Sequence, residues 1–195
     1  MTKTNSQTLF DPVLVHDPVV LRSAKVSDYP AWHALREQSR EHLTRWEEKW
    51  APHQATLSSF KRRLRSYERD RKRGGGLSLL IFRQSDDTLL GGVTLTNIRY
   101  GASRSGLMGY WLGEKFTGRG YATAAVNAVI HHAFEKIDLN RIVAACQPEN
   151  GASQKLLENC GFSQEGIARN YLKINGEWRD HLIYSKIASD GSLQD

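Results

Sequence analysis

Phe116-Thr117-Gly118-Arg119-Gly120-Tyr121-Ala122 is a glycine-rich stretch that lies between two apolar patterns. The strand-like run of residues 107–112 precedes it, and apolar side chains recur at helical spacing over residues 121–134 after it. A glycine turn that opens a helix leaves backbone N–H groups unpaired, and the helix dipole adds partial positive charge there. Glycine also lets a phosphate group come close to the backbone. The stretch therefore predicts a strand–turn–helix unit that binds a phosphorylated ligand.

Two familiar classes of glycine loop do not fit this stretch. A P-loop needs Lys and then Ser or Thr after its last glycine, whereas Gly120 is followed by Tyr121 and Ala122. A dinucleotide-binding fingerprint needs a third glycine in an early βαβ unit, and here several strand-like runs come first. The glycine turn, residues 117–122, therefore belongs to another class of phosphate site.

Length and composition indicate one ordinary globular domain. The chain has 195 residues, of which 39% are hydrophobic and 25% charged, so a full apolar core is expected. The net charge of +6 favours an acidic partner such as nucleic acid, the ribosome, an acidic peptide or a polyanionic cofactor, although mild basicity is also common without one. Two cysteines form no disulfide framework, and no signal peptide or membrane-spanning run is apparent, so we expect a soluble, cytoplasmic protein.

The order of patterns along the chain predicts a three-layer α/β domain with a mixed sheet. We expect an arm over residues 1–17, a single domain over residues 18–188 and a polar tail over residues 189–195. Ser27 is the predicted N-cap of a first helix that runs to Leu43, with Pro30 in its first turn. The other expected helices cover residues 56–73, 121–134 and 150–159, and the expected strands cover residues 19–21, 77–82, 89–98, 107–112, 141–146 and parts of 162–187.

The helix over residues 56–73 is strongly basic on one side. Leu57, Phe60, Leu64 and Tyr67 share one face, and the other face carries eight cations. Such a helix binds RNA or an anionic membrane surface, or is simply a solvated face. The sequence leaves these alternatives open.

Other polar and aromatic residues invite two interpretations each. Trp46 and Trp50 lie in a charged connector, where they either cap the core or line the mouth of a substrate site. His131 and His132 are expected on the outer surface of a helix, not at a metal, because no third ligand stands at suitable spacing.

A second segment follows the glycine turn one strand and one helix later. Asn150-Gly151-Ala152-Ser153 precedes Leu156 and then Cys160-Gly161-Phe162. Asn150 is a good N-cap and equally a candidate ligand contact.

Together, the two segments resemble the GCN5-related N-acetyltransferase (GNAT) family, whose pyrophosphate loop reads Gln/Arg-x-x-Gly-x-Gly/Ala. Thr117 stands where the family has Gln or Arg, while Gly120 and Ala122 fit the other two motif positions, so the backbone cradle is intact. The resemblance implies a GNAT-like three-layer α/β/α domain with a mixed, mostly antiparallel sheet splayed at the cofactor site. It also implies acetyl-CoA as cosubstrate and no metal. The cofactor contacts that it implies are Trp111, Leu112, Thr117, Gly118, Arg119, Gly120, Tyr121, Ala122 and Asn150.

Residues 109–116, 162–166 and 171–181 resemble in particular the RimJ-type ribosomal-protein-alanine N-acetyltransferases. This resemblance implies direct acetyl transfer to the α-amine of a ribosomal protein, small-subunit protein number five, with Trp46 on the substrate side. Tyr110 and Tyr171 are candidates to line the slot for the amine, or they simply pack. The alternatives are another amine acceptor, either a small molecule or a different protein N-terminus, and a ribosome-assembly factor that binds through the basic helix over residues 56–73.

Direct transfer needs no covalent enzyme intermediate, so Cys146 and Cys160 are interpreted as buried structural thiols. The strand over residues 109–112 is expected to offer a backbone N–H to the thioester oxygen.

Many relatives have a tyrosine where this chain has Leu157, so Ser153 is the candidate that contacts the leaving sulfur, or it is an ordinary first-turn serine. Glu114 is the candidate base; the other carboxylates considered for this role are Glu47, Glu48 and Glu165.

Overall fold

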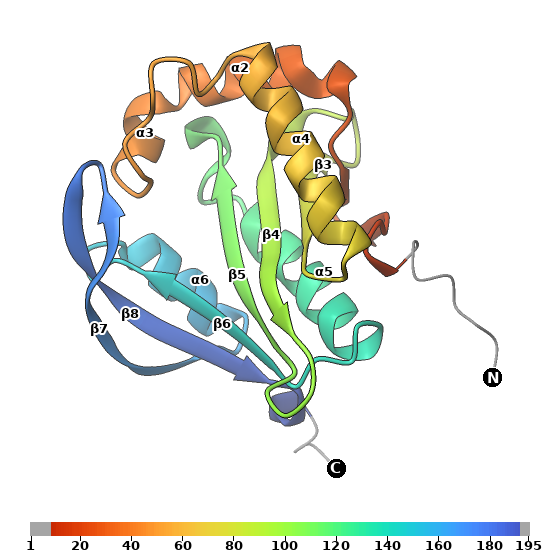
Figure 1. The fold of residues 1–195 in the computed structure, drawn as a ribbon, viewed down its shortest axis with the longest axis vertical. Coiled ribbons are helices and arrows are strands. Elements are labelled where there is room, and N and C mark those ends of the chain that lie inside the picture. Colours follow the sequence, from red (N-terminus) through yellow and green to blue (C-terminus); the bar gives the residue numbers. More distant parts are fainter. Residues whose placement is uncertain (1–8, 192–195) are drawn as a thin grey trace.

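The computed structural model describes residues 9–191, and these residues form one mixed sheet between two layers of helices (Figure 1). The order across this 8-stranded sheet is β1-β2-β3-β4-β5-β6-β8-β7. The strands are β1 (Leu14–His16), β2 (Val19–Ser23), β3 (Leu77–Arg83), β4 (Leu89–Arg99), β5 (Ser105–Leu112), β6 (Arg141–Cys146), β7 (Ser163–Ile174) and β8 (Glu177–Ile187).

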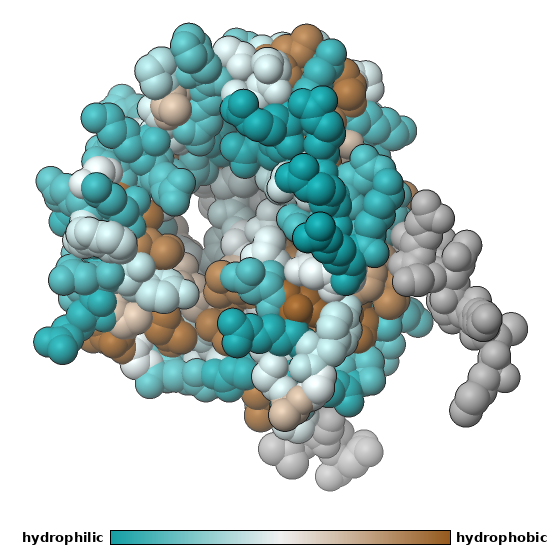
Figure 2. Space-filling view, viewed as in Figure 1, coloured by the Kyte–Doolittle hydropathy of each residue, from teal (hydrophilic) through white to brown (hydrophobic). Residues whose placement is uncertain are grey.

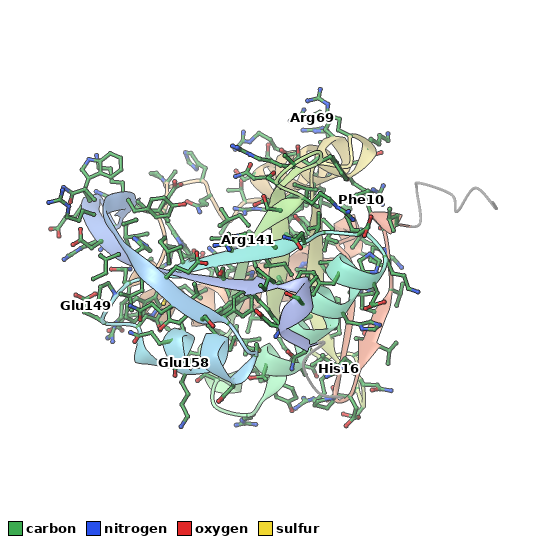
Figure 3. The ribbon with its side chains drawn as sticks, turned by 90° about the horizontal axis from the view of Figure 1, so that it is seen from below. Phe10, His16, Arg69, Arg141, Glu149 and Glu158 are labelled. Carbon is green, nitrogen blue, oxygen red and sulfur yellow. The ribbon has the colours of Figure 1, made fainter. Side chains whose placement is uncertain are left out.

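Helices cover both faces of the sheet. They are α2 (Tyr29–Gln38), α3 (Arg40–Thr44), α4 (Leu57–Lys72), α5 (Tyr121–Glu135) and α6 (Gly151–Asn159), with short 3-10 turns η1 (Val26–Asp28), η2 (Glu114–Phe116) and η3 (Ala188–Gly191). Figure 3 shows Arg69 of α4 on one side of the sheet and Glu158 of α6 on the opposite side. The apolar face of α5 is fully enclosed, with Ala125, Val126 and Val129 at 0% exposure. These layers confirm the predicted three-layer α/β class with a mixed, mostly antiparallel sheet.

The centre of the sheet opens between β5 and β6. Residues Ser105 to Met108 of β5 pair in parallel with Arg141 to Ala144 of β6, and the pairing stops there. Beyond Met108, β5 pairs only with β4, up to Leu112 opposite Gly91. Figure 1 shows the two strands diverging toward the end of β5. The backbone of β5 on the side that faces β6 is therefore free at Gly109–Leu112, as the splayed sheet predicts.

The C-terminal strands interleave in a way that the sequence did not indicate. β8 lies between β6 and β7 and is antiparallel to both. The strands and helices thus follow one another along the chain as expected, but the last strand of the chain is inserted between β6 and β7 in the sheet.

The first helix differs from the prediction. Ser27 is not its N-cap, because residues Val26–Asp28 form η1 and Asp28 precedes the first residue of α2. The Asp28 carboxylate accepts hydrogen bonds from the Lys25 amide at 2.6 Å and from both terminal nitrogens of Arg22 at 2.8 Å. The expected helix also breaks at Ser39, so that α2 and α3 are separate.

The described part of the predicted arm is not loose. Phe10 is 5% exposed in the core, and β1 pairs with β2 at the edge of the sheet. Residues 1–8 and 192–195 lie outside the described residues, and the division into arm, domain and tail stays a prediction. None of the helices within residues 9–191 has the length and apolar character to cross a bilayer.

Candidate active site

A cavity of about 360 Å³ lies where β5 leaves β6, and side chains from both faces of the sheet reach it. Figure 2 shows the surface hollowed between α3 and the β7–β8 hairpin on one side and α4 on the other. The lining residues are His42, Leu43, Trp46, Glu47, Met108, Gly109, Tyr110, Trp111, Leu112, Thr117, Gly118, Ala122, Ala145, Cys146, Gln147, Asn150, Ala152, Ser153, Leu156, Leu172 and His181. Of the predicted site residues, Trp46, Tyr110, Trp111, Leu112, Thr117, Gly118, Ala122, Asn150 and Ser153 are among them.

The glycine turn forms one end of this cavity. Gly118 and Gly120 have φ of 69° and 79°, a left-handed conformation that favours glycine, and a Cβ at either would meet nothing within 4 Å. No side chain caps the N-terminus of α5, which begins directly after Gly120. The Thr117 hydroxyl donates to the Glu114 carbonyl oxygen at 2.8 Å. The first amides of α5, which have no side-chain cap, can therefore bind an anion.

Both interpretations of Asn150 are compatible with its position. Its Oδ1 accepts from the Ser153 amide at 3.1 Å and so caps α6. The residue also lines the cavity, where its Nδ2 remains a donor.

Tyr110 and Ser153 form a hydroxyl pair inside the cavity. Their oxygens are 2.6 Å apart, with Tyr110 on β5 and Ser153 in the first turn of α6. Burial raises the pKa of Tyr110, so this hydroxyl keeps its proton over the physiological range. Tyr110 is the predicted substrate contact and Ser153 the predicted contact of the leaving sulfur, and the structure joins the two in one hydrogen-bonded unit.

The cysteines are buried, in agreement with the structural interpretation. Cys146 lines the cavity and is 5% exposed, and Cys160 is equally buried. Burial raises the pKa of both thiols, that of Cys160 to about 11. Both therefore stay protonated at neutral pH and are poor nucleophiles.

A buried arginine builds the opposite wall. Arg36 of α2 is 6% exposed and donates to both carboxylate oxygens of Glu47, at 2.9 and 2.6 Å. Its guanidinium carbon lies 4.2 Å from the ring centroid of Trp50 and 5.0 Å from that of Trp111. The Trp50 indole nitrogen donates to the same Glu47 at 2.9 Å. The charge of Glu47 is thus neutralised and its side chain is held in the wall, and Arg36, which holds it, is not among the predicted site residues.

The β7–β8 hairpin closes the same side and brings in a second residue that was missed. Leu172 and His181 line the cavity, whereas Tyr171 does not, although its ring stands edge-on to His181 with centroids 5.6 Å apart. The Asn175 amide at the hairpin tip donates to the Glu47 carbonyl at 3.0 Å. His181 ends the stretch of residues 171–181 that resembles the RimJ-type enzymes, so the sequence contains a signal for it.

Several predicted residues lie outside the lining set. Glu114 is exposed on η2, and its backbone amide donates to the Ser39 hydroxyl at 3.0 Å. Glu48 is exposed, and Glu165 pairs with Arg141 and accepts from Ser185. Among the four carboxylates considered as bases, only Glu47 lines the cavity.

The predicted cofactor contacts outside the lining are Arg119, Gly120 and Tyr121.

The prediction for the adjacent histidines is wrong for one of them. His131 is exposed, but His132 is 7% exposed, and its Nε2 lies 2.7 Å from the Leu9 carbonyl oxygen, because the N-terminal segment packs over α5. Within residues 9–191, no three His, Cys, Asp or Glu side chains gather in a way that would hold a metal ion.

Comparisons with known proteins agree with this geometry. The profile of the family described as "Acetyltransferase (GNAT) domain" matches residues 19–163. A Bacillus subtilis protein that bears the name of an N-acetyltransferase, YjcK, is 33% identical over 172 residues, which are 88% of this chain and 95% of that protein. The ribosomal protein uS5-alanine N-acetyltransferase of Escherichia coli is 30% identical over 179 residues, 91% of each chain.

Among solved structures, Mycobacterium smegmatis RimJ in complex with CoA-disulfide is similar with a TM-score of 0.86 and 31% identity. The match covers 94% of this chain and 88% of that one. Fold, cavity and sequence therefore agree, and the chain belongs to the GNAT family and is an N-acetyltransferase.

Proposed function

We propose that this N-acetyltransferase moves the acetyl group of acetyl-CoA to the α-amine of a ribosomal-protein N-terminus, the alanine of small-subunit protein uS5. The observation that carries the proposal is the cavity at the β5–β6 opening, which has the glycine turn at one end and the α3 and β7–β8 segments at the other. One side of the opening suits a phosphorylated thioester and the other suits an entering amine. The identity of the E. coli relative supports alanine of uS5 as the acceptor.

Acetyl-CoA fits the residues that are present. The uncapped amides of α5 and the open space at Gly118 and Gly120 accommodate its pyrophosphate. The free backbone of Gly109–Leu112 can bind the pantetheine arm as a strand and donate one N–H to the thioester oxygen. We assign to Asn150, which lines the cavity, a hydrogen bond from its Nδ2 to the same arm.

The transfer itself needs no covalent intermediate. A neutral amine attacks the acetyl carbon, the carbon–sulfur bond breaks, and the thiolate leaves. We assign the proton donor for the thiolate to Ser153, whose hydroxyl is bonded to that of Tyr110. A hydroxyl pair can pass a proton along its hydrogen bond, so the raised pKa of Tyr110 does not prevent a relay from solvent.

The test uses acetyl-CoA and a peptide with the alanine-started N-terminus of uS5. We expect release of the CoA thiol and a gain of one acetyl group, located at the α-amine by fragment mass. The matched control is the same peptide with a blocked N-terminus, which should stay unmodified. If only polyamines or other small amines accelerate thiol release, the protein-acceptor proposal fails.

A second measurement tests the acceptor in the cell. Intact masses of ribosomal proteins from a deletion strain should show uS5 without its acetyl group. If every N-terminus keeps its normal mass in that strain, the ribosomal assignment is wrong.

The basic side of α4 supports a contact with ribosomal RNA. Its exposed cations are Lys61, Arg62, Arg65, Arg69, Lys72 and Arg73, and Figure 2 shows a strongly hydrophilic surface over this helix. Neutralising Arg62, Arg65 and Arg69 to Gln should weaken RNA binding and reduce its salt dependence, by about one in the log–log slope for each lost phosphate contact. Unchanged salt dependence would assign the cations to a solvated face. Binding to ribosomal particles that survives the loss of acetyl-CoA binding would instead favour an assembly role.

A further inference from the structure

His181 is a buried histidine that the mechanism so far leaves without a role. It is 3% exposed, lies on β8, and lines the cavity. Buried positions mostly hold apolar side chains, so a buried ionisable side chain at a ligand site is a candidate for a chemical role.

The hydrogen bond of the ring fixes its tautomer. Nδ1 lies 3.0 Å from the carbonyl oxygen of Arg179, and a carbonyl can only accept, so Nδ1 carries the hydrogen. In the neutral ring, Nε2 then holds a lone pair. Within residues 9–191, every side-chain nitrogen or oxygen atom that is shielded from solvent has a hydrogen-bond partner. Among these residues Nε2 of His181 has no such partner, so this atom is not fully shielded from solvent. His181 is itself a lining residue of the cavity.

Strand alternation places His181 on the amine side of the opening. The Tyr184 hydroxyl is within 3.5 Å of Glu158 on α6, so Tyr184 and Leu182 face the α5–α6 layer. His181 therefore faces the other layer, where Glu47 and Trp111 form the wall around Arg36. The Ser153–Tyr110 pair lies toward α6, on the sulfur side.

From this arrangement we propose that Nε2 of His181 is the general base that takes a proton from the acceptor amine. The bound α-ammonium gives one proton to Nε2 and becomes a neutral amine. Its nitrogen bonds to the acetyl carbon, the carbon–sulfur bond breaks, and the second amine proton reaches the thiolate through solvent and the Ser153–Tyr110 hydroxyls. The imidazolium returns its proton to water. The role rests on the proposed transfer to an α-amine.

Other titratable groups face the same space. Tyr171 packs edge-on against the His181 ring, and His42, Glu47, Tyr110 and Cys146 share the cavity lining. Glu47 is occupied by Arg36 and Trp50, and burial keeps Tyr110 and Cys146 protonated. His42 is half-buried on α3 and is the direct competitor for the role.

The test compares three variants. His181→Asn keeps a side-chain amide that can donate to the Arg179 carbonyl but removes the Nε2 lone pair. His42→Asn removes the competitor. His132→Gln is the matched control, because His132 is also buried and hydrogen-bonded to a backbone carbonyl, but in the last turn of α5 and against Leu9.

For His181→Asn we expect kcat for the uS5 peptide to fall about 100-fold at pH 7, with the KM for acetyl-CoA unchanged. The acid limb of kcat/KM should move up toward pH of about 8, where an α-amine loses its proton unaided. The difference in rate between the wild type and His181→Asn should therefore become smaller as the pH rises above that value. His42→Asn and His132→Gln should keep the wild-type pH profile.

The proposal is overturned if His181→Asn keeps the wild-type pH profile, or loses rate equally at every pH, or if His42→Asn moves the acid limb instead. These outcomes are distinct from failure of the proposed function, in which the wild-type protein itself does not acetylate the peptide.

Discussion

The two sides of the cavity are built in different ways. The α5–α6 side relies on two short contiguous segments, the glycine turn and residues 150–153, and largely on backbone groups. The α2–α3 side relies on side chains from four separate parts of the chain, including Arg36, Glu47, Trp111 and His181. A backbone cradle tolerates changes in side chains, whereas a wall of interlocked side chains changes its shape with each substitution. The first design suits a common cosubstrate, and the second suits selection of one acceptor.

The largest effect is expected at the glycine turn. Gly120→Trp forces a non-glycine residue to φ of 79° and fills the open space before α5. We expect acetyl-CoA affinity to fall about 100-fold, measured by calorimetry, a loss of about 2.7 kcal/mol. Gly101→Trp is the matched control, because Gly101 has φ of 74° and equally open surroundings in the β4–β5 turn. Equal losses in both variants would show a folding defect and not a ligand site.

A smaller effect is expected from the hydroxyl pair. Tyr110→Phe and Ser153→Ala should each lower kcat by about 10-fold or more, since general acid catalysis commonly contributes 10²–10⁴-fold and water can replace part of it. The double variant should lose little more than the worse single one, because both remove the same hydrogen bond. Steady-state kinetics with saturating acetyl-CoA measures kcat of the two single variants and of the double variant. Fully additive losses would mean that the two hydroxyls act separately.

The smallest effect on activity is expected where α2 is anchored. Burial alone would raise the pKa of Asp28, but the bonds from Arg22 and the Lys25 amide lower it overall. A lowered pKa adds stability that is present above the unfolded value of about 3.9 and is lost as the pH falls through the folded value. Asp28→Asn should therefore cost about 1–3 kcal/mol of unfolding free energy at pH 7.

Denaturant titrations at several pH values check this effect. The difference between wild type and Asp28→Asn should shrink below pH of about 4. The variant should raise the KM of the peptide more than that of acetyl-CoA, since α2 carries Arg36. A difference that is constant with pH would exclude the ion pair as its cause.

The same contrast explains what the sequence could reveal. The limits of β6, the start of α5 at Tyr121 and the Asn150 cap follow from patterns within a dozen residues, and these were predicted. Tertiary packing alone brings together Arg36, Glu47 and His181. The sequence around each of these residues contains no pattern that predicts the other two. Ser27 is not the N-cap because it lies within η1, and Asp28 of that turn pairs with Arg22, a residue outside the helix. His132 is buried because a distant segment at Leu9 covers it.

The position of β8 in the sheet has a consequence for how the protein folds during synthesis. β8 is the last of the described strands, yet it lies between β6 and β7 inside the sheet. During synthesis, β5, α5 and β6 are made before residues 177–187 and can pair before β8 is available. Until β8 inserts, the edge of β6 is open, and such an edge invites pairing with other chains. The cosubstrate side can thus form early, while the acceptor wall is completed only by the final strand.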